Sequence, residues 1–308
     1  MKRADQPPFG FLGRLFLGTE DERVYAAVRI GFSLAALFNL ALLWPLRETL
    51  FTTSGAVDME AALASNQTGT VLLFHLFQSP GGVTLLMSLA ALSMVLLMAG
   101  VLPRLAAAAV FLWHVSYIER APPALAGWDM VLRAFSFLVL VSPMGRCWSL
   151  PAWWRRTAVA PAQVARYGLL LMRLQVLAIY LQTVISKITN PNPYWRNGEF
   201  LPYFLTSHFA RWPGTWAAEH AYLLVPATVL ALVLEIAVPV LLFIRRTRWW
   251  GALLGLLLHG SISLVARNIE PFMLAMFMTY LAFLRREDVE RLERCLPRRR
   301  RPDKTTGK

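Results

Sequence analysis

Residues 172–198 combine an apolar helical pattern with several polar and ionisable side chains. Within this stretch, Arg173, Tyr180 and Lys187 are spaced by seven residues. Seven residues at about 100° each make two turns less about 20°, so the three side chains lie on nearly one face of a helix. An ionisable group that faces lipid costs several kcal/mol. We therefore expect this face to turn toward the protein interior or a wet cavity.

The chain as a whole has the composition of a membrane protein. It has 308 residues, of which 56% are hydrophobic and only 16% are charged, whereas soluble domains have about 25% charged residues. The apolar residues form blocks of roughly the length that crosses a bilayer as a helix. They predict an all-α polytopic bundle of about eight transmembrane helices with additional interfacial helices. The expected helices are 24–43, 83–102, 104–118, 128–142, 168–187, 222–244, 249–266 and 271–284.

The net charge of +13 is distributed unevenly between the two sides of these helices. With eight spans, 22 of the 31 Lys and Arg residues fall on the side of the two termini and six on the other side. The positive-inside rule then predicts a multi-pass protein of the cell membrane with cytoplasmic N- and C-termini. The expected partner of the basic residues is the lipid bilayer. Nucleic acid is not expected, because no stacking aromatic residues accompany the basic tail.

The sequence predicts one transmembrane domain, 1–284, followed by a basic cytoplasmic tail, 285–308. Cys147 and Cys295 both fall on the predicted cytoplasmic side, where thiols are kept reduced. No cleavable signal peptide is recognisable before the first apolar block. The histidines and carboxylates lack the spacing of metal ligands, so no metal site is predicted.

Several polar groups lie inside the predicted helices. Glu235 is near the middle of its helix, so it should be neutral or paired. Arg29 and Arg173 lie at a similar depth, and either a structural ion pair or substrate binding would explain the carboxylate. Asp129 and Arg133 are four residues apart and are expected to pair along one helix face.

The two central histidines differ in what they indicate. His114 favours a structural hydrogen bond, whereas His259 is consistent with either a structural or a functional role.

Lys187 has two interpretations. A lysine at the end of a span commonly extends to the membrane interface. Alternatively, it is a partly buried amine that burial makes easier to deprotonate, and thus a candidate base. The segment 191–198 that follows is rich in turn and aromatic residues and could cover the amine, which favours the second interpretation.

The order of several motifs resembles that of a known family. WDMVLRAFSFLVLVSPMGRCWSL, LVLEIAVPVLLF and LLHGSISLVARNIEPFML follow one another as in the HTTM membrane domain, which vitamin K-dependent γ-glutamyl carboxylase shares. The most specific part is the pattern R-x-Q-x4-Y-x6-K-I-x6-W-x2-G. Its residues here are Arg173, Gln175, Tyr180, Lys187, Ile188, Trp195 and Gly198.

The resemblance implies a chemistry for these residues. In the carboxylase, the lysine at the position of Lys187 is understood to deprotonate vitamin K hydroquinone. Reaction with oxygen then yields a strong base that removes a γ-proton from glutamate before CO2 adds. By resemblance, Lys187 would be the extracytoplasmic base, Tyr180, Trp195 and His259 would border a vitamin K-type quinol, and no metal would be required.

The chain also departs from the carboxylase. Ser186 replaces a second lysine, the stretch 119–129 has no clear equivalent of an active-site histidine, and no large lumenal region follows the helices. The sequence therefore leaves open whether the protein is an enzyme. The alternative is a non-catalytic maturation or export partner of a small secreted peptide, similar to the HTTM protein of the sporulation-delaying toxin system. A transporter is disfavoured because internal repeats are not evident.

Overall fold

The computed structural model describes residue 16 and residues 18–65, 72–124, 126–144, 146–154 and 161–295, and the described chain is almost entirely helical. The predicted all-α class is confirmed. All eight predicted ranges form helices whose ends lie within about four residues of the expected positions. These helices are α2 (Glu22–Leu43), α5 (Pro80–Ala99), α6 (Pro103–Arg120), α7 (Gly127–Val141), α9 (Tyr167–Thr189), α12 (Ala221–Phe243), α13 (Arg248–Val265) and α14 (Glu270–Tyr280).

Short elements connect and cover the long helices. Two strands, β1 (Thr19–Asp21) and β2 (Gln163–Ala165), pair in antiparallel orientation. The short α-helices are α3 (Arg47–Phe51), α4 (Met59–Ser65), α8 (Leu150–Trp154), α10 (Phe200–Thr206), α11 (Trp216–Glu219) and α15 (Arg286–Cys295). The 3-10 helices are η1 (Trp44–Leu46), η2 (Leu72–His75), η3 (Pro122–Ala124), η4 (Pro193–Trp195) and η5 (Leu281–Phe283).

Four segments of the described chain are both long and apolar enough to cross a membrane. They are Glu22–Phe51, Pro80–Ala99, Tyr167–Thr189 and Ala221–Phe243. The shorter α7 and α14 have 15 and 11 residues, fewer than the roughly 20 that a bilayer core requires. The structure is thus that of a helical membrane protein, and eight spans remain a prediction.

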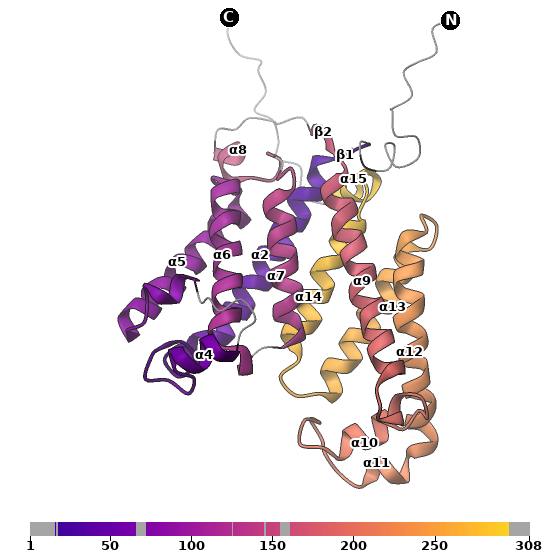
Figure 1. Ribbon diagram of the computed structural model, residues 1–308. Helices are drawn as coiled ribbons and strands as arrows, with labels where there is room; N and C mark the ends of the chain where they lie inside the picture. The colour runs from indigo at the N-terminus through magenta and orange to yellow at the C-terminus, as the bar shows by residue number, and fades with distance from the viewer. Residues whose placement is uncertain are drawn as a thin grey trace, which may run out of the picture.

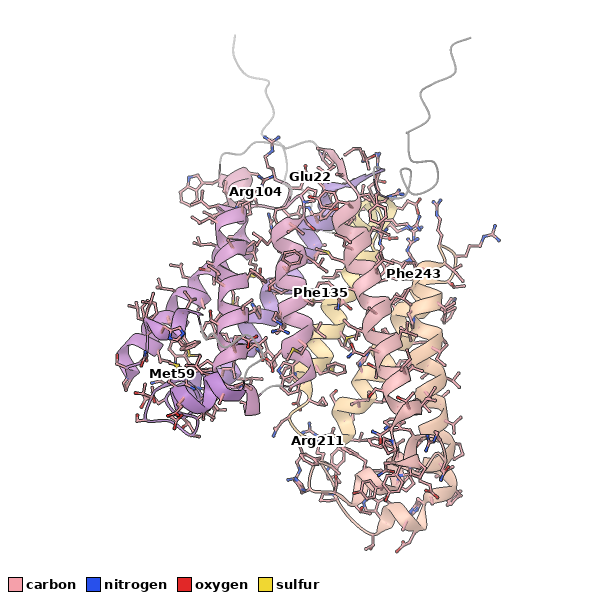
Figure 2. All side chains as sticks on the ribbon, in the orientation of Figure 1. Glu22, Met59, Arg104, Phe135, Arg211 and Phe243 are labelled. Atoms are coloured by element: carbon pink, nitrogen blue, oxygen red, sulfur yellow. The ribbon has the colours of Figure 1, made fainter. Side chains whose placement is uncertain are left out.

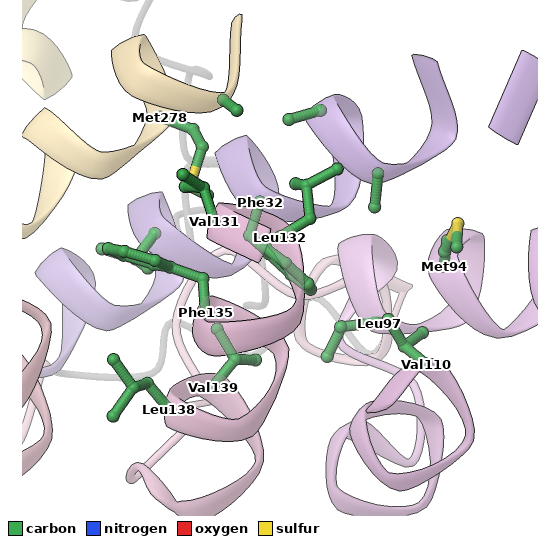
Figure 3. Packing of buried hydrophobic residues seen from close by; sticks show 14 of the residues in the cluster. Phe32, Met94, Leu97, Val110, Val131, Leu132, Phe135, Leu138, Val139 and Met278 are labelled. Atoms are coloured by element: carbon green, nitrogen blue, oxygen red, sulfur yellow. The ribbon is translucent and has the colours of Figure 1, made fainter. Parts of the chain in front are cut away.

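The long helices form one bundle with two distinct ends (Figure 1). We call the end that carries β1, β2 and α15 the ribbon end, and the end that carries α10 and α11 the cap end. Figure 2 shows Glu22 and Arg104 at the ribbon end and Met59 and Arg211 at the opposite end. The apolar core lies between them. Figure 3 shows Phe32, Leu132, Phe135 and Met278 meeting where α2, α7 and α14 pack together.

At the ribbon end, side chains join segments that are far apart in the sequence. Asp21 caps α2 by accepting a hydrogen bond from the backbone N–H of Arg23 at 2.9 Å. The Arg23 guanidinium also pairs with Glu293 of α15 at 2.7 Å, and Trp148 donates to the same carboxylate at 3.0 Å. Glu22 accepts the backbone N–H of Cys147 at 2.9 Å. The start of α2, the loop before α8, and α15 are therefore held as one unit.

Two glycines allow α13 to approach its neighbours closely. A Cβ on Gly251 would lie 2.8 Å from the backbone nitrogen of Leu242 in α12. A Cβ on Gly255 would overlap with the hydroxyl oxygen of Tyr280 in α14. Small residues four apart are a common device for close helix contact in membranes, because lipid supplies no hydrophobic drive for association.

We expect Gly255→Ala to destabilise the bundle by about 1–3 kcal/mol, the usual cost of overpacking. The measurement is the unfolding midpoint of the purified protein in detergent. Gly260→Ala is the matched control on the same helix, since a Cβ there meets nothing within 4 Å. Equal midpoints for the two variants would contradict the inferred close contact.

Candidate functional site

The face of α9 that carries Tyr180 and Lys187 turns into the bundle. Tyr180 is buried, and only 18% of the Lys187 side chain is exposed. Their neighbours come from α12, α13 and α14, three helices that follow α9 in the sequence and pack around its second half. Tyr180 and Lys187, seven residues apart, thus lie on the same interior face of α9, as their spacing predicts.

Lys187 forms an ion pair with Glu235 of α12. Its amine also lies over the ring of Trp195, 4.1 Å from the ring centroid, where a cation is attracted by the π-electrons. The amine is thus held between a carboxylate and an aromatic ring of the protein. Glu235 is four residues before Pro239, which has no N–H to donate to the Glu235 carbonyl. The helix therefore lacks one backbone hydrogen bond at the residue that pairs with Lys187.

Glu235 is paired, and its partner is Lys187 rather than Arg29 or Arg173, the cations that counting along the chain places at a similar depth. Arg173 instead donates to the carbonyl of Ala282 at 2.8 Å and lies 3.4 Å from Glu20. Arg29 donates to the carbonyl of Trp148 at 2.8 Å. Fourteen residues of helix separate Arg173 from Lys187 by about 21 Å, so one helical face contributes to two separate regions of the protein.

A hydrogen-bonded group of rings lies beside the ion pair. The Tyr180 hydroxyl contacts Nε2 of His259 at 2.9 Å and also bonds to the hydroxyl of Tyr280. The edge of Phe272 packs against the His259 ring, with centroids 5.2 Å apart and planes at 79°. Tyr280 was not predicted as a site residue. Gly255 is the sequence signal that accompanies it, because only a residue without a side chain leaves room for its hydroxyl.

Two buried polar atoms of this site have no hydrogen-bond partner among the described residues. They are Oε2 of Glu235 and Nδ1 of His259. An unsatisfied buried polar atom carries a free-energy cost of about 1–3 kcal/mol. A ligand with hydroxyl groups could remove this cost by donating to the carboxylate and bonding to the imidazole. The site therefore offers hydrogen-bonding positions to a ligand with hydroxyl groups, next to a lysine and a carboxylate that can exchange a proton.

Trp195 belongs to an aromatic cover next to Lys187. It lies in η4 and stacks on Phe200 of α10, with centroids 3.9 Å apart. Gly198 makes this turn possible, because its φ is +80° and a Cβ would lie 2.8 Å from Cγ1 of Val225. The sequence W-x2-G thus encodes both the ring that covers the amine and the turn that packs the cover against α12.

Asp129 and Arg133 do not pair, so that prediction was wrong. Asp129 is in the first turn of α7, where its carboxylate reaches back to the N–H of Ala126 at 2.8 Å. It also accepts from the Tyr117 hydroxyl at 2.6 Å and from Asn39 at 3.1 Å. Arg133 pairs with Glu119 at 3.3 Å. Helix capping and partners on other helices outweigh the local spacing of four, and Asn39 and Tyr117 were not predicted as polar partners.

The remaining predicted groups have simpler environments. His114 is buried, and its Nδ1 bonds to the carbonyl of Val110 at 2.8 Å, one turn earlier in α6. No group of three or more potential metal ligands occurs among the residues that the structure describes. Lys187, Glu235, Trp195, Tyr180, His259 and Tyr280 thus form the candidate site.

The helical bundle has the features of an integral membrane protein, and its candidate site is a partly buried lysine paired with a glutamate. The chain matches the HTTM domain over residues 22–287 and therefore belongs to the HTTM domain family. This domain is linked to the membrane part of vitamin K-dependent carboxylase. Comparison with curated proteins and with solved structures gave no match in either set.

We expect Glu235→Gln to destabilise the protein, because it leaves the Lys187 charge without its partner. Breaking a buried pair costs about 3–5 kcal/mol. Because the Lys187 side chain is partly exposed, we expect the loss of unfolding free energy to be about 3 kcal/mol or less. The double variant Lys187→Met/Glu235→Gln should regain part of this loss, since both charges are removed.

A double-mutant cycle on unfolding free energies in detergent measures the coupling. Glu219→Gln is the control, an exposed carboxylate at the cap end, and it should change stability by no more than about 0.5 kcal/mol. Additive single-variant effects would show that the two side chains are not coupled.

Proposed function

We propose that this HTTM protein is a membrane enzyme of the carboxylase-like class, in which Lys187 removes a proton from a quinol-type hydroxyl. The supporting observation is the Lys187 amine held between the Glu235 carboxylate and the Trp195 ring, beside buried polar atoms that lack partners. A base, a water-excluding cover and unsatisfied hydrogen-bonding atoms are the components that proton abstraction requires.

The side chains present fit a quinol. Glu235 Oε2 and His259 Nδ1 offer two hydrogen-bonding positions for hydroxyl groups, and the Phe272 ring beside His259 is an apolar neighbour. When bound, a quinol supplies the reducing equivalents for chemistry with oxygen. Tyr180 and Tyr280 would hold the His259 ring in place through the hydroxyl contacts described above.

Lys187 needs a neutral amine to accept a proton. Transfer of one proton from Nζ to the Glu235 carboxylate converts the ion pair into two neutral groups. In a low-dielectric interior, the two charges of the ion pair are costly because they have lost their hydration. The neutral pair is therefore closer in free energy to the ion pair than it is in water. Glu235 would therefore take the amine proton, Lys187 would take the hydroxyl proton, and Trp195 would keep water away from both.

We limit this role to proton removal, because the chain departs from the carboxylase at two places. Ser186 occupies the position of the second lysine, and the stretch 119–129 has no clear equivalent of the active-site histidine. The substrate of the reaction that follows is a small molecule, a peptide or a lipid.

A second candidate is a non-catalytic maturation or export partner for a small peptide. The observation that favours it is a group of exposed aromatic side chains at the cap end, Tyr203, Phe209, Trp212 and Trp216. Exposed aromatic residues of this kind are common where a protein meets a peptide or the membrane interface. This function requires the cap surface but not the Lys187 amine.

Lys187→Met should reduce the quinone that co-purifies with the protein by about tenfold or more, the effect expected from loss of one charge-assisted hydrogen bond. The measurement is native mass spectrometry of the purified protein with analysis of the bound lipids. Gln182→Met, at an exposed position of the same helix, should retain the quinone. Absence of quinone from both wild type and Lys187→Met, at equal thermal stability, would contradict the enzyme and favour the peptide partner.

We also propose that the ribbon end faces the cytoplasm of the cell. Cys295 is exposed in α15 at this end, whereas Cys147 is buried. Burial and the nearby Glu22 carboxylate raise the pKa of the Cys147 thiol to about 12. Since the reactive species is the thiolate, Cys147 should react very slowly near neutral pH.

A membrane-impermeant maleimide should therefore label Cys295 only after cells that express the protein are permeabilised. Cys295→Ser is the control and should abolish the rapid labelling. Rapid labelling of Cys295 in intact cells would reverse the topology and place the Lys187 site toward the cytoplasm.

A further inference from the structure

A second polar region, distinct from the Lys187 site, lies at the ribbon end. It is a cavity of about 250 Å³ between the start of α9, the junction of α12 and α13, and the residues that follow η5. Its polar lining consists of four arginines and a single carboxylate. The arginines are Arg166, Arg173, Arg248 and Arg285, and the carboxylate is Glu20.

The positive charges of this cavity exceed the negative charges available to them. Arg248 is satisfied separately, because both oxygens of Asp288 accept hydrogen bonds from its guanidinium at 2.6 and 2.7 Å. One oxygen of Glu20 lies 3.4 Å from Arg166 and 3.4 Å from Arg173. These are long contacts that divide one charge between two arginines. Arg285 also lines the cavity, so three guanidinium groups lie near one carboxylate that forms ion pairs with two of them.

Arg285 is the least compensated of these residues. Its side chain is half-buried, and no residue in the described part of the chain forms a hydrogen bond or ion pair with its guanidinium. Burial and repulsion from Arg248 and Arg245 lower the pKa of Arg285, although arginine stays charged at neutral pH. A dianionic or monoanionic group in the cavity would relieve this repulsion and provide acceptors for the free N–H groups.

The side chains around the cavity are of the kinds found at the head-group level of membranes. Phe243 lines it, and Trp249 and Trp250 are exposed at the start of α13, a position typical of the aromatic belt. A narrow apolar cleft adjoins the cavity and shares Leu242, Arg248 and Phe283 with it. Charged and apolar surfaces therefore meet at one place, as the head group and chains of a phospholipid require.

We propose that this cavity binds the phosphate of an anionic phospholipid, with Arg166, Arg173 and Arg285 as its ligands and the acyl chains along α12 and α13. Arginine presents a planar set of N–H donors that matches phosphate oxygens. The bound lipid would join α9, α12, α13 and the start of α15 without any contribution from the Lys187 site.

The test uses the full-length protein in detergent with added phosphatidylglycerol, phosphatidylcholine or inorganic phosphate. Phosphatidylglycerol should bind and raise the thermal midpoint, because a ligand that binds only the native state stabilises it. Native mass spectrometry of the same samples gives the apparent affinity. Arg285→Gln should weaken phosphatidylglycerol binding by about tenfold. Arg246→Gln is the matched control, an exposed arginine at the same end, and should leave binding unchanged.

The alternative outcomes are distinct. Equal binding of phosphatidylglycerol to wild type and Arg285→Gln would overturn the proposed site, as would equal effects of phosphatidylglycerol and phosphatidylcholine. Stabilisation by inorganic phosphate to the same extent would overturn a lipid ligand. If Arg285→Gln does not fold, Arg166→Gln serves as the second variant, because its only ionic contact in the described chain is the 3.4 Å contact with Glu20.

Discussion

Charged and polar side chains inside this bundle depend on partners from other helices, because no water is available at membrane depth to stabilise them. Lys187 of α9 is paired with Glu235 of α12, and the Tyr180 hydroxyl of α9 contacts Nε2 of His259 in α13. Arg29 of α2 reaches the backbone carbonyl of Trp148 in the loop before α8. Each contact between two helices fixes both which helices are neighbours and their relative height. Apolar packing alone specifies these features weakly, because lipid tails compete with apolar side chains on nearly equal terms.

The same helix, α9, serves two regions with different chemistry. Near the cap end it contributes Tyr180 and Lys187, which lie among rings, a carboxylate and polar atoms without partners. Near the ribbon end it contributes Arg173 to a cavity with excess positive charge. Arg173 and Lys187 are about 21 Å apart along the helix axis. Substitutions can therefore perturb proton chemistry and lipid binding separately, provided that the helix itself remains packed.

The sequence was sufficient to predict the helices, because each contains an apolar block whose length and flanking polar residues mark its ends. It also predicted that Tyr180 and Lys187 share an interior face, since this follows from helical periodicity alone. The partners were harder to predict. Counting along the chain placed Arg173 at the depth of Glu235, but the structure pairs Glu235 with Lys187, about 21 Å further along the same helix. The relative height of α9 and α12 decides this pairing, and the sequence does not specify it.

The Asp129 case has a different cause. The spacing to Arg133 was suitable, but the first turn of α7 leaves backbone N–H groups free, and the carboxylate bonds to one of them. Tyr280 was missed because a tyrosine in an apolar helix has no pattern of its own. Its role is visible only where Gly255 of another helix gives it space.

The contacts at the ribbon end also bear on how the chain is made. Arg23, near the start of the first long helix, is joined to Glu293 in α15, and Trp148 binds the same carboxylate from the middle of the chain. During synthesis, the early helices enter the membrane long before Glu293 emerges from the ribosome. Until then, Arg23 lacks this partner, and the ribbon end cannot close. Completion of this junction is therefore a late event in biogenesis, because it requires residues from the start, the middle and the last described helix of the chain.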